Sequence, residues 1–303
     1  MISNKTICLK CKSKNIIKWC KRKTENRGLI QRYKCKDCGK YFVIDDGFYR
    51  MRNSPQKITC AMDLYFKGLS TRKVQDHFQA FYPHNSSWVS IYNWVIKYSK
   101  QISKFTETLK LQSGEEVQID EIEYKRRKSH KKGEKGTEDN YFVDSIDPIT
   151  KFMVASNYVQ ARGNPELEEV AKRIKTKTEK QVKMVTTDGL LNYEGIVKSV
   201  WGYNNKLGKY NVFHNRIVTS KEEDVFNYQI ERLHNSIRAR TKVMRGFHGS
   251  VISANAIMKG YEIYYNFITK HQAINCCPYE LATDLQLKSN NKWLELVEMS
   301  VIN

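Results

Sequence analysis

Three acidic residues, far apart in the sequence, have the types and positions that a divalent-cation site requires. Asp120 ends the strand-like run Val117–Asp120, and Asp188 ends a second such run, Val182–Asp188. Glu231 borders the apolar stripe of a helix-like stretch. Three carboxylates that meet cannot all stay ionised without a cation, and two Mg²⁺ or Mn²⁺ ions about 4 Å apart neutralise such a set and assist phosphoryl transfer. The pattern predicts that chemistry if the fold brings the three together.

The helix that carries the glutamate is predicted over Val225–Arg240. Its apolar stripe consists of Phe226, Ile230, Leu233 and Ile237, which recur at helical spacing. Cationic and amide side chains border or follow this stripe, and cations and amides bind phosphate oxygens. We therefore expect the following residues to lie near the substrate phosphates as DNA contacts: Arg232, His234, Asn235, Arg238, Arg240 and Lys242.

Three other acidic residues lie close to the predicted strands. Strand alternation turns Glu121 to the face opposite Asp120, so we expect that Glu121 is not a ligand. Asp144 is interpreted as a polar strand position, and Asp147 as a turn former before proline. Either of these two is an alternative to one of the catalytic aspartates.

Four cysteines form two C-x2-C knuckles, Cys8 with Cys11 and Cys35 with Cys38. Two such knuckles complete a tetrahedral Zn²⁺ site, and the strand-like runs between them indicate a zinc ribbon. So short a segment cannot bury a sufficient core, so one structural zinc ion is expected to supply much of its folding energy. The alternative is a set of redox or free thiols. The many lysines and arginines of this segment favour contact with DNA as well.

The next stretch has the pattern of a helix-turn-helix module. Helices are predicted to begin after Ser54, after Ser70 and near Ser87, each with an apolar face. Their lengths and turns favour a DNA-binding arrangement, with an ordinary three-helix bundle as the alternative. The outward positions of the third helix that we expect to contact DNA are Ser90, Asn93 and Lys97.

The middle of the chain alternates between strand-like and helix-like stretches. Strands are expected at 116–124, 140–146, 151–159, 182–188 and 210–214, and helices at 165–180, 193–201 and 225–240. This order predicts an α/β fold with a mixed sheet flanked by helices, in which Asp120 lies on the central strand and Asp188 on its neighbour. A basic run at 125–135 is either a solvated loop or a phosphate-binding loop. Its first four members are candidate DNA contacts: Lys125, Arg126, Arg127 and Lys128.

Composition agrees with a nucleic-acid partner. The 303 residues carry a formal net charge of +20, and 40% are hydrophobic, which is enough for about two domains with real cores. Such a charge favours a polyanion, and a basic surface without a partner or an acidic lipid surface are the alternatives. The first residues lack the apolar segment of a signal peptide, and no run is long enough to span a membrane. We expect a cytoplasmic protein associated with the nucleoid.

The motifs together resemble those of the DDE transposases of prokaryotic insertion sequences. The matching stretches are CLKCKSK, RYKCKDCGKYF, GLSTRKVQDHF, QIDEIEY, YFVDSIDPITK, TTDG, NYQIERLHNSIRARTKVMRGF and YYNFITKHQAINCCPYELA. The resemblance implies a ribonuclease-H-like core in which Asp120, Asp188 and Glu231 form the catalytic, metal-binding triad. It also implies binding of terminal inverted repeats by the N-terminal modules, strand cleavage and transfer, and a homodimer or higher oligomer on double-stranded DNA.

The resemblance implies five segments. These are a zinc ribbon at 1–46, a helix-turn-helix domain at 47–101, a linker helix at 102–114, the catalytic core at 115–285 and a C-terminal tail at 286–303. Two other functions stay open at this point. One is a DNA-binding regulator with a non-catalytic core, and the other is a ribonuclease-H-fold nuclease that cleaves DNA without joining it.

Overall fold

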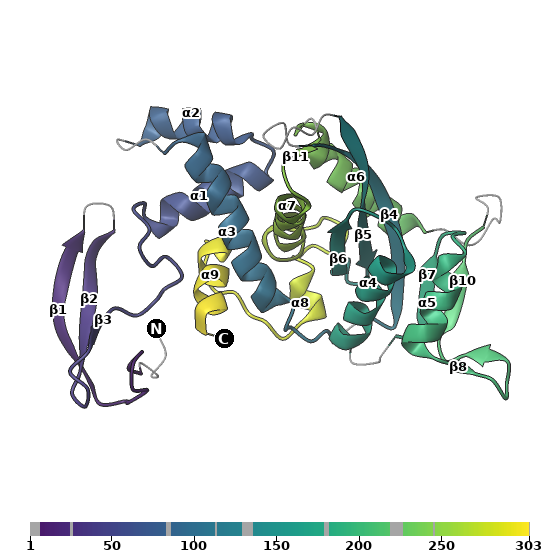
Figure 1. Cartoon of the computed structure of the whole chain (residues 1–303), viewed down its shortest axis with the longest axis horizontal. Coiled ribbons are helices and arrows are strands. Elements are labelled where there is room, and N and C mark those ends of the chain that lie inside the picture. The colour runs from purple at the N-terminus through teal and green to yellow at the C-terminus, as the bar shows by residue number, and fades with distance from the viewer. Residues whose placement is uncertain are drawn as a thin grey trace.

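The computed structural model describes residues 7–24, 27–82, 86–112, 114–128, 136–178, 182–218, 227–244 and 246–302. A small N-terminal sheet, a module of three helices and a larger α/β core follow one another (Figure 1). Val225 at the start of the predicted helix, Phe226 of its apolar stripe, and residues 129–135 of the basic run lie outside the described residues. Among the described helices, none combines the length and apolar character needed to cross a membrane.

The N-terminal sheet is antiparallel and has three strands, β1 (Ile16–Thr24), β2 (Gly28–Cys35) and β3 (Tyr41–Phe42). The two long strands confirm the predicted pair of strands between the cysteine knuckles. Its buried hydrophobic cluster is very small and consists of Cys8, Cys35 and Phe42. A sheet with so little core depends on another stabilising interaction.

The helical module contains α1 (Pro55–Phe66), α2 (Thr71–Phe81) and α3 (Trp88–Thr106). Ser54, Ser70 and Ser87 cap them, and each hydroxyl accepts the backbone N–H three residues further on. The three predicted helices are therefore confirmed, and so are their starting points. The expected separate linker helix is wrong, because α3 continues to Thr106 as one helix of 19 residues. The predicted boundary at 101 therefore falls inside a helix.

The core sheet has the strand order β10-β7-β4-β5-β6, with β11 beside β4. Its strands are β4 (Glu116–Arg127), β5 (Thr137–Ile146), β6 (Met153–Val159), β7 (Met184–Thr187), β10 (Phe213–Arg216) and β11 (Phe247–His248). β4 is central and β7 is its parallel neighbour, as predicted. β4 is longer than the predicted strand, so Lys125, Arg126 and Arg127 belong to a strand and not to a loop. A two-stranded ribbon, β8 (Tyr203–Asn204) and β9 (Lys209–Tyr210), lies apart.

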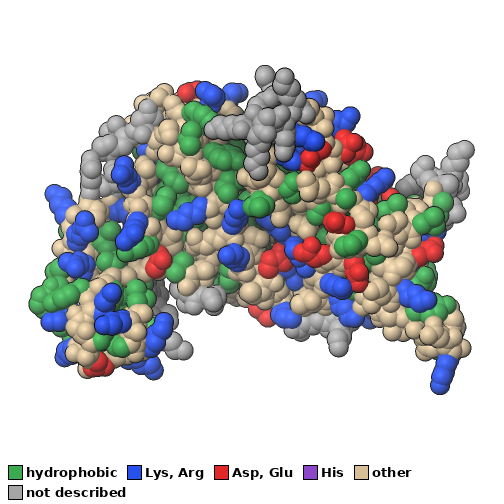
Figure 2. Space-filling model, viewed as in Figure 1, with side chains coloured by type: hydrophobic (Ala, Val, Ile, Leu, Met, Phe, Trp, Pro, Cys, Tyr) green, Lys and Arg blue, Asp and Glu red, His purple; other side chains and the backbone are tan. Residues whose placement is uncertain are grey.

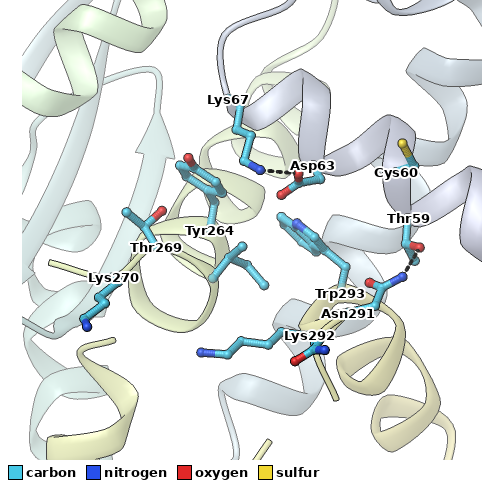
Figure 3. A pocket seen from close by; sticks show the side chains of 12 residues that line it. Thr59, Cys60, Asp63, Lys67, Tyr264, Thr269, Lys270, Asn291, Lys292 and Trp293 are labelled. Atoms are coloured by element: carbon cyan, nitrogen blue, oxygen red, sulfur yellow. Dashed lines mark hydrogen bonds and ion pairs between the residues drawn. The ribbon is translucent and has the colours of Figure 1, made fainter. Parts of the chain in front are cut away.

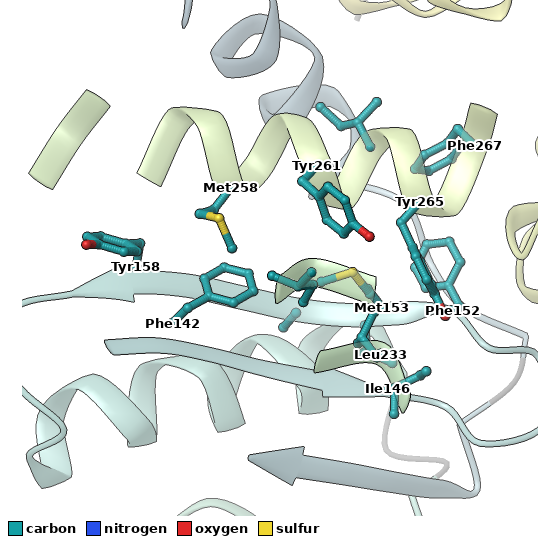
Figure 4. Packing of buried hydrophobic residues seen from close by; sticks show 14 of the residues in the cluster. Phe142, Ile146, Phe152, Met153, Tyr158, Leu233, Met258, Tyr261, Tyr265 and Phe267 are labelled. Atoms are coloured by element: carbon teal, nitrogen blue, oxygen red, sulfur yellow. The ribbon is translucent and has the colours of Figure 1, made fainter. Parts of the chain in front are cut away.

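Helices cover both faces of this mixed sheet. They are α4 (Asn164–Lys177), α5 (Asn192–Trp201), α6 (Tyr228–Lys242) and α7 (Val251–Ile263), the last continued by a π-helical turn at Tyr264–Ile268. Figure 4 shows Met258 and Tyr261 of α7, and Tyr265 of the π-helical turn, packed over Phe142 and Met153 of the sheet. The opposite face contacts α4, where Asn157 donates a hydrogen bond to Glu169.

The helical module and the α/β core share one hydrophobic cluster. Helix α7 lies against α3, and the contact is close at Gly260, where an added Cβ would lie 2.2 Å from Phe66 Cζ and 2.3 Å from Ser99 Oγ. The chain ends with α8 (Tyr279–Ala282) and α9 (Lys292–Ile302). Helix α9 packs on α1 and α3 through buried Trp293, so the prediction of a C-terminal tail is wrong (Figure 1).

A buried ionic cluster ties the end of α3 to the core. Glu107 lies 2.6 Å from Lys259 of α7 and 3.3 Å from Lys177 of α4. Lys259 also contacts Glu262 at 2.9 Å, and Ser156 of β6 donates a hydrogen bond to Glu262. Oppositely charged partners and hydrogen bonds compensate for the desolvation of these groups. The cluster fixes the helical module relative to the sheet.

Candidate functional site

The two predicted aspartates meet at one rim of the core sheet. Strand β7 pairs with β4 in parallel as far as Ile119 and Thr187, and then ends. Asp120 and Asp188 are the next residues on the two strands, so their side chains reach the same rim. The Asp188 carboxylate accepts the backbone N–H of Leu190 at 3.0 Å, which fixes the turn after β7. Sequence reasoning therefore placed both residues correctly.

Glu121 belongs to the same group, contrary to the prediction. Ligand oxygens of Asp120, Glu121 and Asp188 all lie within 4.8 Å of one another. Alternation still directs the Glu121 side chain to the face opposite Asp120, but β7 no longer flanks β4 beyond Ile119 and leaves that edge of the strand open at Glu121. The side chain of Glu121 therefore reaches the rim from the other face. The backbone N–H of Glu121 also donates to Asp120 Oδ1 at 2.8 Å.

The electrostatics of this group fit a divalent cation. Burial raises the pKa of Asp120 to about 6, although His234 opposes the shift. Burial and the negative charges of Asp188 and Asp120 raise the pKa of Glu121 to about 7. Glu121 Oε1 is buried, and the buried Tyr193 hydroxyl faces this carboxylate without a well-formed hydrogen bond to it. Hard oxygen ligands with an unsatisfied carboxylate oxygen are what Mg²⁺ or Mn²⁺ requires, so these residues fit the expected ions.

Glu231 is not part of that group. It lies in the first turn of α6, and its side chain is exposed. His234, one turn later, is buried, with Nε2 2.7 Å from Asp144 Oδ1 and Nδ1 3.6 Å from Asp120 Oδ2. The prediction that His234 contacts DNA is therefore corrected, because its ring faces the protein interior. Burial opposes a charged imidazole, but Asp144 outweighs it and raises the pKa of His234.

Several predicted DNA contacts line one depression of about 800 Å³ beside α6, which we call the α6 groove. The predicted residues that line it are Lys125, Arg127, Asn235, Arg238 and Lys242. They come from β4 and α6, the two elements that carry Asp120 and Glu231. Arg232 is exposed on the same helix, next to a smaller cavity of about 210 Å³. The groove therefore presents cationic side chains, together with Glu123, on these two elements.

Two more predicted contacts are corrected by their burial. Arg126 is held by Asn140 and Glu138 within the sheet, with Nε 2.9 Å from Asn140 Oδ1. Arg240 donates to the backbone carbonyl of Tyr65 and lies 4.6 Å above the centre of its ring. Both guanidinium groups are used inside the protein, and Arg240 joins α6 to α1.

Four further predicted DNA contacts are neither buried in the interior nor part of the α6 groove. In α3, Asn93 and Lys97 are exposed, and Ser90 is half-buried with its hydroxyl 3.1 Å from that of Ser87. Lys128 follows β4 and is half-buried. Contact of these four residues with DNA stays a prediction.

The four cysteines form the second candidate metal site. Their sulfur atoms lie within 4.8 Å of one another, with Cys8 and Cys38 at 3.5 Å and Cys11 and Cys35 at 3.5 Å. The backbone N–H of Lys10 approaches the Cys8 sulfur at 3.4 Å. Four thiolates at tetrahedral spacing suit Zn²⁺ in a closed structural site, because no ligand position is left for a substrate.

A groove of about 630 Å³ between the N-terminal sheet and the segment before α1 was missed by sequence reasoning. Four arginines line this arginine groove: Arg22, Arg27, Arg50 and Arg52. Arg27 is fixed by Asp46 and by the Phe48 carbonyl, and exposed Tyr49 lies under Arg50. Figure 2 shows lysines and arginines spread over this end of the molecule, whereas most acidic side chains of this view lie over the α/β core. The clustering of Arg50 and Arg52 beside Tyr49 was the available signal.

Another hollow, of about 580 Å³, separates α1 from α9 and the turn after α7 (Figure 3). Its polar groups pair with each other: Asp63 with Lys67 at 2.6 Å, and Thr59 with Asn291 at 2.9 Å. We interpret it as the seam along which α9 docks.

The described geometry thus offers one carboxylate cluster, one cysteine cluster and two cationic grooves. Comparison of the chain with models of known protein families and with curated proteins gave no match.

Proposed function

We propose that this protein is a metal-dependent DNA transposase of the DDE type, which binds element ends and then cleaves and joins DNA strands. One observation carries the proposal. Asp120 and Asp188, which come from distant parts of the chain, present carboxylate oxygens within 4.8 Å at the rim of a mixed sheet. Mg²⁺ or Mn²⁺ bound there would activate a water or a 3′-hydroxyl and stabilise the leaving oxygen.

The chain's own residues have separate roles in this proposal. Asp120, within β4, and Asp188, directly after β7, would hold the cation, and Glu121 would supply a further buried oxygen. Glu231 is exposed in the first turn of α6, outside that group, and is the proposed third member of the triad. The α6 groove places Arg238 and Lys242 where the phosphates of a bound strand need cations.

The N-terminal parts are proposed to recognise the element ends. The four-cysteine cluster would hold Zn²⁺ in a ribbon, and the helical module would act as a helix-turn-helix. The arginine groove lies between them and provides cations for the DNA backbone. Because two ends must be joined, the active form is proposed to be a dimer or a higher oligomer.

The test incubates the purified protein with Mg²⁺ and DNA that carries the flanks of its own gene. Wild type is compared with Asp188→Asn on a denaturing gel. Asp284→Asn is the matched control, because Asp284 is exposed and pairs with Gln112 at the end of α8. We expect joined strands from wild type and the control, and none from Asp188→Asn.

The other outcomes identify the two alternatives. Nicked strands without joined products would indicate a nuclease. Binding of the flanks without cleavage, even with Mn²⁺, would indicate a DNA-binding regulator and would remove the proposed chemistry.

A further inference from the structure

We propose that Asp144 and His234 form a buried positioning pair that orients Asp120 for metal binding. The imidazole bridges two carboxylates, because Nε2 lies 2.7 Å from Asp144 Oδ1 and Nδ1 lies 3.6 Å from Asp120 Oδ2. The inference rests on the proposed function only for the identity of the reaction. The inference itself concerns which side chains hold the Asp120 carboxylate in place.

The fold explains why these three side chains meet. The antiparallel register of β4 and β5 pairs Asp120 directly with Asp144, so both side chains project toward α6. Directly opposed residues have Cβ atoms about 4.5–5.5 Å apart, and like charges so placed repel each other. The ring of His234 enters from α6 and separates the two carboxylates with its nitrogen atoms. Register and helix position together create the bridge.

Stability alone does not account for such a pair. The side chains of Asp144 and His234 are 0% and 3% exposed, respectively. Buried ion pairs are often no more stabilising than apolar residues of the same volume. Asp144 Oδ2 also has no hydrogen-bond partner in the described structure. The pair therefore costs desolvation that packing does not require, and its geometry is directed at Asp120.

The pair restricts Asp120 on the side that the backbone leaves free. Asp120 Oδ1 accepts the Glu121 N–H at 2.8 Å, and Oδ2 faces the imidazole. A hydrogen bond thus holds Oδ1, and a charge contact longer than a hydrogen bond lies at Oδ2, so both favour one orientation of the carboxylate before a cation arrives. Groups that orient a metal ligand in this way typically change metal affinity 10- to 100-fold when they are mutated. His234 also lies three residues after Glu231, so it anchors the turn of α6 that carries the proposed third carboxylate.

The test measures Mn²⁺ affinity by isothermal titration calorimetry on the full chain without DNA. In His234→Gln the side-chain amide replaces Nε2 and keeps the contact with Asp144, whereas in His234→Asn it replaces Nδ1 and keeps the group that faces Asp120. We expect affinity to fall about 10- to 100-fold in His234→Gln and in Asp144→Asn, and less in His234→Asn.

Asp147→Asn is the matched control. Asp147 is also buried and belongs to the same hairpin, but its carboxylate bonds to Thr150 and the backbone of the turn. This variant is expected to lower the melting temperature and to leave Mn²⁺ affinity unchanged. Melting curves without metal show which variants are folded.

Two results overturn the positioning role. One is unchanged Mn²⁺ affinity in folded His234→Gln and Asp144→Asn. The other is a loss of affinity that only follows the unfolded fraction in all three variants, which would make the pair purely structural. A wild type that binds Mn²⁺ in a His234-dependent way but joins no DNA would instead remove the proposed function and leave the positioning pair in place.

Discussion

The cysteine cluster and the carboxylate cluster both gather ligand atoms within 4.8 Å, but they do so by opposite means. The cysteines lie at the end of β2 and in the turns beside a small sheet. The buried hydrophobic cluster there consists of Cys8, Cys35 and Phe42, two of which are themselves candidate ligands. The carboxylates lie at the rim of a sheet whose hydrophobic cluster extends into the helical module. We therefore expect the first site to need a metal ion to fold, and the second to be folded before a metal ion binds.

The largest expected effect comes from removing the metal of the cysteine site. Cys35→Ser, or treatment of wild type with a chelator, is expected to unfold β1–β3, because structural zinc contributes about 10–16 kcal/mol in small zinc modules. The α/β core should keep its melting transition. Mass spectrometry measures the loss of zinc, and limited proteolysis measures the unfolding of the N-terminal sheet.

Cys20→Ser is the matched control for that experiment. Cys20 is exposed on β1 of the same sheet and lies outside the four-cysteine group. It should retain one zinc ion and a protected sheet. A metal-free Cys35→Ser sheet that resists protease would contradict the comparison between the two sites.

The second effect breaks the ionic cluster that joins the core to α3. Burial opposes the charge of Glu107, but Lys177 and Lys259 outweigh it and lower its pKa to about 2. Glu107→Gln leaves Glu262 as the carboxylate shared by buried Lys177 and Lys259, and breaking a buried ion pair typically costs about 3–5 kcal/mol. The lowered pKa means that wild type has this stability above the usual glutamate pKa and loses it as the pH falls toward 2. Urea unfolding at pH 7 and at pH 3 should show a smaller difference between wild type and variant at the lower pH.

The two aspartates and the four cysteines could be predicted from sequence because simple rules place them. A parallel neighbour brings the ends of two strands to one rim, which fixes Asp120 and Asp188. Two C-x2-C knuckles determine a four-sulfur site without knowledge of the rest of the fold.

The other features depend on tertiary facts that a single sequence does not contain. Glu121 joins the site because β7 stops at Thr187, and strand alternation alone cannot show where a neighbouring strand ends. The Asp144–His234 contact depends on the β4–β5 register and on the position of α6. Helix α9 is short, and its docking on α1 depends on an apolar surface that exists only in the folded module.

The third effect tests whether the negative charge of the buried Glu121 carboxylate lowers the stability of the metal-free fold. Because the pKa of Glu121 is raised to about 7, its ionisation weakens the metal-free fold as the pH rises from the usual glutamate pKa to about 7. Glu121→Gln should therefore be more stable than wild type at pH 8 without metal, by about 1–3 kcal/mol, and equal to it at pH 4. Thermal melts at both pH values measure this difference. An equal gain at the two pH values would show that charge is not the cause.

The smallest effect concerns the arginine groove, which is lined by guanidinium groups and not by metal ligands. If Arg50 and Arg52 bind phosphates, the double variant Arg50→Gln/Arg52→Gln should reduce the slope of log K against log salt by about 0.9 for each phosphate that is no longer neutralised. Fluorescence anisotropy with the flanking DNA at several salt concentrations gives this slope. Arg173→Gln is the control, because Arg173 of α4 pairs with Glu169 and lies on the α/β core.

The same salt slope distinguishes phosphate contacts in the arginine groove from the effect of a lower net charge. Both substitutions lower the net charge, but only the groove variant removes cations that lie together beside Tyr49 without a carboxylate partner among the described ion pairs. Equal slopes for the double variant and wild type would place the DNA elsewhere, and the α6 groove would then have to supply the phosphate contacts. A reduced slope with unchanged Mn²⁺ affinity would show that DNA binding at the N-terminal sheet and cation binding at the core rim are energetically independent, because their residues share no partners.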